Sequence, residues 1–362
     1  MTRASRLATS PPSTMVRRRT SWSADEFFRD DDRAREQISV VTTNPARVDD
    51  QLPLSVTPAR AAGMAGARDL LALTKPRITA IVLATCASGM AMAPGRLPWR
   101  QAVAALLGTT LIVASANTLN MWWERDLDGL MARTSRRPLP SGRMAAPVAL
   151  AFGLLLAAVS IPLLLSVNLV TALLGVLALV VYVLVYTPMK RHSTLALLVG
   201  AVPGAMPPLM GWTSVTGSVL AAGPARAEAL PQAVQLGGVA LFALLFIWQV
   251  PHFIAISFFR AKDYAAAGMK VVPVERGERV AKWQIFGYTL LLVGSSLGAC
   301  GLAGATYLVA ACVLGAFFVG LSAFGLRAEA GNRWARSLFA YSIVYLVAIL
   351  AIMIVDRTPV WL

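Results

Sequence analysis

Charged residues are scarce in this sequence. Only 14% of its 362 residues are Asp, Glu, Lys or Arg, whereas 57% are hydrophobic. Soluble domains carry roughly 25% charged residues, so a soluble globule of this composition would lack the polar side chains that must cover its surface. The shortage of charge therefore excludes an ordinary soluble protein and predicts a polytopic membrane protein.

Cysteine and histidine are rarer still, with three and two residues respectively. Cys86, Cys300 and Cys312 are odd in number, lie in apolar runs and show no metal-ligand spacing. This pattern excludes a disulfide framework, and we interpret the three cysteines as small apolar residues. Of the two histidines, His252 lies inside an apolar run, where a polar side chain usually faces the interior of a helix bundle.

The first 67 residues lack any long apolar run. They are rich in Ser, Thr, Pro and Arg, and their 10 basic and 8 acidic residues leave a net charge of +2. This composition predicts a disordered N-terminal tail over residues 1–67. The acid-poor first 24 residues resemble a mitochondrial transit peptide, but we favour a bacterial N-terminal extension or a true start at Met15 or Met64. The expected location is a bacterial inner (plasma) membrane, with the mitochondrial inner membrane as the alternative.

Long apolar runs dominate the remainder of the chain, residues 68–362. A helix needs roughly 17–25 apolar residues to cross a hydrocarbon core of ~30 Å, and runs of this length fit helices rather than barrel strands. The sequence therefore predicts an all-α polytopic membrane protein, a bundle of nine transmembrane helices around a central substrate cavity. The nine runs are 77–92, 102–123, 145–165, 170–186, 194–212, 236–259, 285–302, 307–326 and 338–355.

Basic residues indicate the orientation of these runs. The segment before the first run and every second loop after it hold 19 Lys and Arg residues, whereas the alternate loops and the C-terminal end hold 4. By the positive-inside rule, we expect a cytoplasmic N-terminus and a C-terminus outside. The net charge of +15 is then mainly a topology signal for a chain in a lipid bilayer, and we expect no nucleic-acid partner.

The fifth run is rich in residues that interrupt helices. It contains Gly200, Pro203, Gly204, Pro207 and Pro208. Within a membrane, an interrupted helix is tolerated only against protein or a cavity. We therefore expect this run to line the substrate chamber.

A polar stripe follows the end of the second run. Asn120, Glu124 and Asp128 are spaced by four, which places them on one face of a helix, and Asn117 extends that face into the membrane. Asp126 is displaced by about half a turn. Two carboxylates on one stripe repel each other unless a cation lies between them, and oxygen ligands of this kind suit Mg²⁺ shared with substrate phosphates.

Basic and aromatic residues accompany this stripe on the same side of the membrane. Arg133 and Arg137 are again spaced by four, and guanidinium groups match phosphate oxygens. Two further loops repeat the combination of charge and tyrosine. One contains Tyr186, Lys190 and Arg191, and the other contains Arg260, Lys262, Asp263 and Tyr264. The alternative interpretation is that the charges of all three segments are juxtamembrane charges that set topology and pair with one another.

Six segments resemble one family of membrane enzymes. The chain is similar to the UbiA-type membrane prenyltransferases, and its WQVPHF and KDYAAAG stretches are similar in particular to the protoheme IX farnesyltransferases (heme O synthases) within them. The segments occur in family order over residues 68 to about 356 and do not cover the tail. They are LTKPRIT at 73–79, NMWWERDLDGLMARTSRRPLPSGR at 120–143, YTPMKRHS at 186–193, GAVPGAMPPLMGW at 200–212, WQVPHF at 248–253 and KDYAAAGMKVVP at 262–273.

The resemblance implies transfer of a farnesyl group from farnesyl diphosphate to a vinyl group of heme b. The products would be heme O, with its hydroxyethylfarnesyl side chain, and diphosphate, as a step toward heme A and terminal oxidases. Three groups of residues carry the implied roles. The catalytic and Mg²⁺-binding group is Asn120, Glu124, Asp128 and Asp263, with Asp126 as a further catalytic residue; the diphosphate-binding group is Arg133, Arg137, Lys190, Arg191 and Lys262; the heme- or prenyl-binding group is Asn117, Tyr186, Trp248, Gln249 and His252.

One departure and several alternatives remain open at this point. Many UbiA-type enzymes carry a second D-x-x-x-D motif, whereas Asp263 is the one acid in the matching stretch here, which puts a second all-carboxylate cage in doubt. The alternative acceptor is an aromatic quinone precursor, and a more remote alternative is a small-molecule transporter. The sequence leaves open whether His252 contacts heme iron or a propionate, and whether a downstream heme-modifying enzyme is a partner.

Overall fold

The computed structural model describes residues 66–220 and 232–357. The tail predicted over 1–67 therefore lies, except for its last two residues, outside the described residues. Helices account for the regular structure of the described ranges, and no β-strand is found in them. The prediction of an all-α protein is confirmed for this part of the chain.

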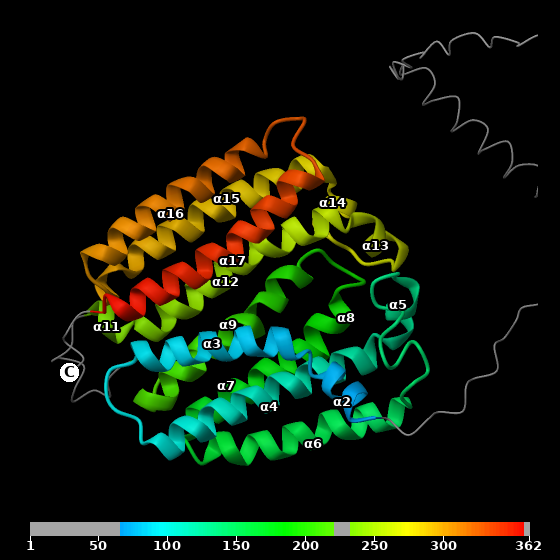
Figure 1. Ribbon diagram of the computed structural model, residues 1–362, viewed down its shortest axis with the longest axis horizontal. Coiled ribbons are helices and arrows are strands. Elements are labelled where there is room, and N and C mark those ends of the chain that lie inside the picture. The colour runs from blue at the N-terminus through cyan, green and yellow to red at the C-terminus, as the bar shows by residue number, and fades with distance from the viewer. Residues whose placement is uncertain (1–65, 221–231, 358–362) are drawn as a thin grey trace, which may run out of the picture. The chain divides into compact units, whose positions relative to one another are not determined.

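Two groups of long helices lie side by side (Figure 1). One group comes from residues 76–216 and the other from residues 237–355. The first group is α3 (Pro76–Met92), α4 (Trp99–Trp123), α6 (Ala146–Leu165), α7 (Leu169–Val180), the π-helix η1 (Val181–Tyr186) with α8 (Thr187–Met189), and α9 (Ala196–Thr216). The second group is α12 (Gly237–Phe259), α15 (Gly277–Gly298) with the 3₁₀ turn η2 (Ala299–Leu302), α16 (Ala305–Phe324) and α17 (Asn332–Val355).

Two central helices join the groups. Helix α9 packs against α3, α7 and α12, and α12 packs against α9, α15 and α17.

Short helices connect the long ones, and several lie at the charged end of the bundle. The short helices are α2 (Ala67–Leu73), α5 (Arg125–Leu130), α11 (Gln232–Gln235), α13 (Ala261–Ala266) and α14 (Val272–Glu275).

Every expected apolar run lies on a helix, but nine is an approximate count of the spans. Within the described ranges, seven helices are long and apolar enough to cross a membrane, and the bent pair α2 and α3, with 50° between its parts, makes an eighth if it is one span. The fifth expected run corresponds to α9, which is not among them. Its prolines and glycines lower its hydropathy, and its residues from Ala205 to Ser214 are buried against other helices rather than exposed.

Helix α9 is continuous from Ala196 to Thr216, although three prolines lie inside it. The expected interruption is therefore absent. Tight packing on α3 supports the helix where its backbone hydrogen bonds are depleted. A Cβ atom on Gly89 would lie 1.9 Å from the Pro208 carbonyl oxygen, and one on Gly211 would lie 1.9 Å from the Cys86 carbonyl oxygen. The two glycines thus allow the backbones of α3 and α9 to approach closely, as small residues do in membrane bundles.

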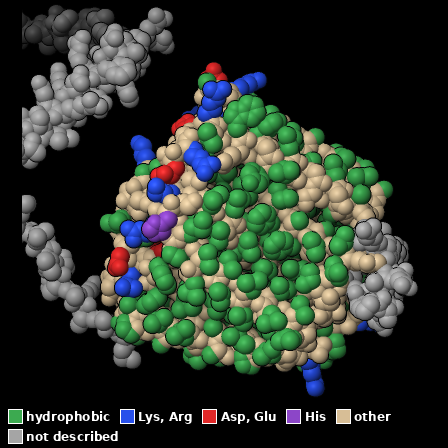
Figure 2. Space-filling model, turned by 180° about the vertical axis from the view of Figure 1, so that it is seen from behind, with side chains coloured by type: hydrophobic (Ala, Val, Ile, Leu, Met, Phe, Trp, Pro, Cys, Tyr) green, Lys and Arg blue, Asp and Glu red, His purple; other side chains and the backbone are tan. Residues whose placement is uncertain are grey.

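Apolar side chains cover the face of the bundle shown in Figure 2, and charged side chains gather along one edge. Exposed large hydrophobic residues are spread along the outer helices, for example Leu155 on α6 and Val313 and Phe317 on α16, which are about 60% exposed. A soluble monomer rarely exposes an apolar surface this extensive. This surface and the long apolar helices make the chain a multi-pass membrane protein.

Candidate active site

Two adjoining cavities, each of about 250 Å³, lie among α3, α4, η1, α9 and α12. The first, here called the polar cavity, is lined by Glu124, Asp128 and several basic residues and reaches the loops at the charged end of the bundle. The second, here called the apolar cavity, is lined mainly by apolar residues of the long helices, such as Ile112 and Leu179, and lies deeper among them. Their shared wall contains Lys75, Ile78, Tyr182, Tyr186, Leu197 and Phe253. A ligand with a charged head and an apolar tail could extend from the first cavity into the second.

The predicted polar stripe forms one wall of the polar cavity. Asn120 is in the last turn of α4, Glu124 joins α4 to α5, and Asp128 is on α5. The backbone N–H groups of Glu124 and Asp128 donate to the carbonyls four residues earlier at 2.9 and 2.8 Å, so the spacing of four keeps the side chains on one face. The three residues are at most 5% exposed and line the cavity.

Basic side chains neutralise both carboxylates. Lys190 Nζ donates to both carboxylate oxygens of Glu124, at 2.8 and 3.1 Å, and Arg137 donates to Asp128 at 2.7 Å. The amide of Asn120 donates to Glu124 at 2.9 Å. Charge-assisted hydrogen bonds of this kind fix the orientation of the acids in a buried setting. Each acid therefore meets a cation from another segment instead of repelling its neighbour.

The donors fit a Mg²⁺ ion shared with a substrate. In the described ranges no cluster of three or more His, Cys, Asp or Glu side chains is arranged to hold a metal. The polar cavity instead offers the two carboxylates of Glu124 and Asp128 and the amide oxygen of Asn120. Mg²⁺ commonly binds through one or two carboxylates and completes its shell with water and substrate phosphates. A site of this composition would be completed by a substrate that carries phosphate oxygens.

The other two predicted acids lie outside both cavities. The Asp126 side chain is 86% exposed and lies 3.8 Å from Arg125, because its position half a turn from the stripe directs it away from the cavity. Asp263 pairs with Arg260 at 3.5 Å on α13 and lines neither cavity. The structure therefore brings together three of the five acidic and amide residues that sequence reasoning grouped as catalytic.

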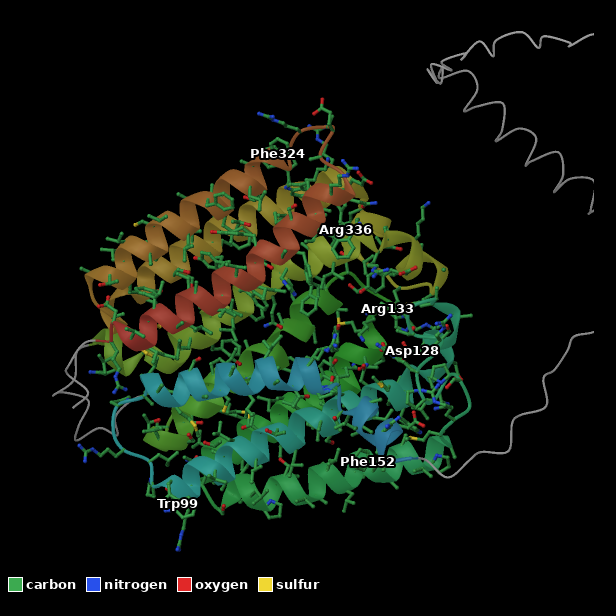
Figure 3. The ribbon with its side chains drawn as sticks, viewed as in Figure 1. Trp99, Asp128, Arg133, Phe152, Phe324 and Arg336 are labelled. Carbon is green, nitrogen blue, oxygen red and sulfur yellow. The ribbon has the colours of Figure 1, made fainter. Side chains whose placement is uncertain are left out.

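Three predicted basic residues, Arg133, Arg137 and Lys190, line the polar cavity. Asp128 and Arg133 lie at the same end of the bundle near α5 (Figure 3). Arg191 and Lys262 do not line either cavity.

Sequence reasoning assigned no role to Lys75 or Lys270, which also line the polar cavity. Lys75 lies in the break between α2 and α3, with a left-handed backbone φ of 49°, and its Nζ is 3.4 Å from Asn120 Oδ1. Burial, together with the charges of Arg137 and Lys190, lowers the pKa of Lys75 to about 7. The Lys-Pro step of LTKPRIT could have indicated the break, since a residue before proline avoids the helical region.

Two tyrosines lie at the junction of the cavities. The π-helix η1 places Tyr182 and Tyr186 with ring centroids 5.2 Å apart, and Lys190 Nζ lies 4.4 Å from the centroid of Tyr186. Single π-turns inside helices occur frequently at functional sites. Tyr186 was predicted and Tyr182 was missed, although its position four residues before Tyr186 places it on the same side of a helix.

The residues of α12 divide between the apolar cavity and the contact with α17. Gln249 lines the apolar cavity, as does Asn117 from α4. His252 instead stacks between Trp248 and Phe339, at centroid distances of 4.5 and 4.7 Å.

The expectation that Gln249 and His252 share a face does not hold. His252 Nδ1 is 2.7 Å from the Ser342 hydroxyl, and Trp248 Nε1 donates to the Ser342 carbonyl at 2.7 Å. At 3.6 residues per turn, His252 is rotated about 40° from Trp248 and about 60° from Gln249 around the helix axis, so it faces α17 with Trp248. Neither Trp248 nor His252 lines either of the two cavities.

Comparisons with known proteins identify relatives of this chain. Relatives named protoheme IX farnesyltransferase include one from Myxococcus xanthus (strain DK1622), 48% identical over 81% of this chain and 96% of its own length. Another is from Sorangium cellulosum (strain So ce56), 50% identical over 72% of this chain and 88% of its own length.

Solved structures share the fold. One is described as digeranylgeranylglyceryl phosphate synthase (TM-score 0.65, 16% identity, 80% of this chain and 97% of that chain). Another is a UbiA homolog from Archaeoglobus fulgidus bound to GPP and Mg²⁺ (TM-score 0.56, 18% identity, 79% and 99%). Residues 82–344 match the model of the UbiA prenyltransferase family. The chain therefore belongs to the UbiA prenyltransferase family.

Proposed function

We propose that the chain transfers a farnesyl group from farnesyl diphosphate to a vinyl group of heme b, which gives heme O and diphosphate. One observation carries the proposal: a polar cavity with paired acids and an excess of basic residues adjoins an apolar cavity, and the two share a wall that contains three aromatic side chains. The relatives named protoheme IX farnesyltransferase support heme as the acceptor over an aromatic quinone precursor.

The polar cavity would hold the diphosphate. Arg133, Arg137 and Lys190, with the newly found Lys75 and Lys270, would neutralise its oxygens as the allylic C–O bond breaks. Lys190 and Arg137 already contact acids, so they are oriented before the substrate arrives. Stabilising charge on the leaving group is the main catalytic task of such a reaction.

Asn120, Glu124 and Asp128 would hold Mg²⁺, and a family structure bound to GPP and Mg²⁺ supports the choice of metal. The bound ion would supply positive charge to the leaving diphosphate. The chain's own part is to hold three oxygen donors on one buried face, at most 5% exposed, beside the basic groups.

The farnesyl chain and the allylic carbon would lie deeper. Tyr182, Tyr186 and Phe253 line both cavities, so their rings would flank the carbon that bears developing positive charge. The apolar wall beyond them excludes water from most of the cation's surroundings. Asn117 and Gln249 are polar groups on that wall.

The membrane setting completes the proposal. We place the protein in the inner membrane of a bacterium with its N-terminus in the cytoplasm, so that the polar cavity opens toward cytoplasmic farnesyl diphosphate. The more hydrophobic heme would pass to a downstream heme-modifying enzyme on the way to heme A.

A complementation assay tests the proposed function. The chain is expressed in a host that lacks its own heme farnesyltransferase, and the extracted hemes are separated by hydrophobicity. A more hydrophobic heme should appear only with the chain, and its amount should collapse in Glu124→Gln and Asp128→Asn variants expressed at wild-type levels. In membranes given heme b and aromatic acids in parallel, turnover with an aromatic acid alone would refute the proposal.

A further inference from the structure

An amide oxygen on the wall of the apolar cavity accepts no hydrogen bond from the described residues. Gln249 is 5% exposed, and its Nε2 donates to the carbonyls of Ala201 and Leu245, each at 3.1 Å. Only the NH₂ end of the side chain can satisfy two carbonyls, so Oε1 lies on the other side. Among the described residues, no hydrogen bond reaches this oxygen.

A glycine on α9 makes room for the oxygen. A Cβ atom on Gly204 would lie 1.9 Å from Gln249 Oε1, and both residues line the apolar cavity. An acceptor on a cavity wall that has no protein donor can accept a hydrogen bond from a ligand or a water that enters the cavity. The position is therefore suited to accept a hydrogen bond from a molecule in the apolar cavity.

The reaction under the proposed function, on which this inference rests, consumes one water. The allylic C–O bond breaks and diphosphate leaves with the electron pair, and the vinyl π pair then forms the new C–C bond to the farnesyl carbon. This leaves a cation on the vinyl carbon next to the porphyrin ring. A lone pair of water forms the C–O bond to that carbon, and the released proton passes to the diphosphate.

Without water at that point, the cation has another outcome. It loses a proton from the adjacent CH₂ to diphosphate and becomes an alkene, a product lighter by one water. The hydroxylated product thus requires a water that is held close to the cation inside an apolar chamber.

We propose that Gln249 positions this water by accepting a hydrogen bond from one of its O–H groups at Oε1. The amide is suited to the task because it is neutral, so it does not trap the cation, and both of its own N–H donors are occupied. The water lone pair then remains free to attack. Gly204 leaves the space that Oε1 occupies at the cavity wall.

The test is the product ratio in Gln249→Met, which keeps the length of the side chain and removes the acceptor. Wild type and variant are reconstituted with heme b, farnesyl diphosphate, Mg²⁺ and heavy-oxygen water, and the products are separated by mass. The ratio of hydroxylated to dehydrated product should fall by about tenfold, whereas the total farnesylated heme should fall much less. Gln284→Met is the matched control, because Gln284 lies on α15 and lines neither cavity.

A second variant tests the same oxygen from the opposite helix. Gly204→Ala places a methyl group where Oε1 now lies and should shift the ratio in the same direction; it decides the question if Gln249→Met fails to fold. A wild-type chain that makes no farnesylated heme overturns the proposed function and this inference together. Wild-type hydroxylated product with unchanged ratios in the variants overturns the role of Gln249 alone.

Discussion

The most informative substitution is Asp128→Asn. It preserves the size of the side chain, removes the negative charge and leaves Arg137, now 2.7 Å from the carboxylate, without its partner. If Asp128 helps to stabilise the leaving diphosphate through the metal, kcat should fall by roughly 10²–10³, the usual effect of removing one preorganised electrostatic group. The variant should also require more Mg²⁺ for half-maximal rate.

Stability should change much less than activity. Asp128 is 2% exposed, but the Arg137 side chain is 24% exposed and can turn toward water when its partner is neutral. We therefore expect a loss of about 1–2 kcal/mol in unfolding free energy rather than the larger penalty of a fully buried orphan charge. Thermal unfolding in detergent measures this loss of stability separately from turnover.

The comparison that decides the reasoning is Asp126→Asn. Asp126 is two residues away, carries the same charge and is 86% exposed outside the cavity. Rates are measured with purified protein, heme b, labelled farnesyl diphosphate and a Mg²⁺ titration. Asp126→Asn should stay within about threefold of wild type, the scale of a surface charge change of ~0.5 kcal/mol. Equal losses in both variants, or an active Asp128→Asn, would refute the assignment of the metal site.

Three further predictions follow from particular contacts. Tyr182→Phe should keep most of the activity, whereas Tyr182→Leu should lose roughly tenfold in kcat, because the ring face rather than the hydroxyl stabilises a cation by ~1–2 kcal/mol. Steady-state rates with farnesyl diphosphate measure both losses, and equal losses in the two variants would assign the effect to the hydroxyl. Gly89→Ala should destabilise the fold by about 2 kcal/mol or more, because the new Cβ would lie 1.9 Å from the Pro208 carbonyl oxygen. Thermal unfolding should show this loss, and Gly287→Ala is the control, because a Cβ on Gly287 has no atom of another residue within 4 Å. Asp356→Ala should lower the unfolding free energy by about 1 kcal/mol, because Asp356 Oδ2 accepts from the Tyr307 N–H at 2.7 Å at the start of α16. Limited proteolysis of the loop before α16 should be faster in the variant, and an unchanged rate would contradict this contribution.

The sequence was sufficient for the features that depend on spacing along one helix. The spacing of Asn120, Glu124 and Asp128 predicted a shared face, and the structure buries all three on one cavity wall. Apolar runs predicted the long helices because burial in lipid imposes length and composition on each helix separately. The count of nine is approximate because α9 is less apolar than the other long helices, since neighbouring helices rather than lipid surround much of it.

Features that depend on contacts between segments were beyond sequence reasoning. Lys75 reaches Asn120 only because α2 and α3 bend at the Lys-Pro step, and no periodic pattern gives the direction of that bend. His252 was expected near the substrate, yet its direction is set by packing against Ser342 and Phe339 on α17, some 90 residues away. A helical wheel gives relative angles on α12 but not which angle faces the cavity.

The charge balance of the polar cavity favours an anion before any metal binds. Five basic residues line it, against the two acids Glu124 and Asp128. Under the proposed function, a prenyl diphosphate would carry several negative charges into the cavity and would compete with Glu124 for Lys190 and with Asp128 for Arg137. Each ion pair that the diphosphate opened would release a carboxylate to a metal, so diphosphate and Mg²⁺ would favour each other's binding through the same two pairs. By this linkage, a side chain that neutralises an acid in the free protein would become a diphosphate ligand in the complex, and the intact pair provides each buried acid with a counter-charge until then. The basic and acidic members of the site are therefore one coupled unit, and removing either partner of a pair should weaken the affinity for both ligands.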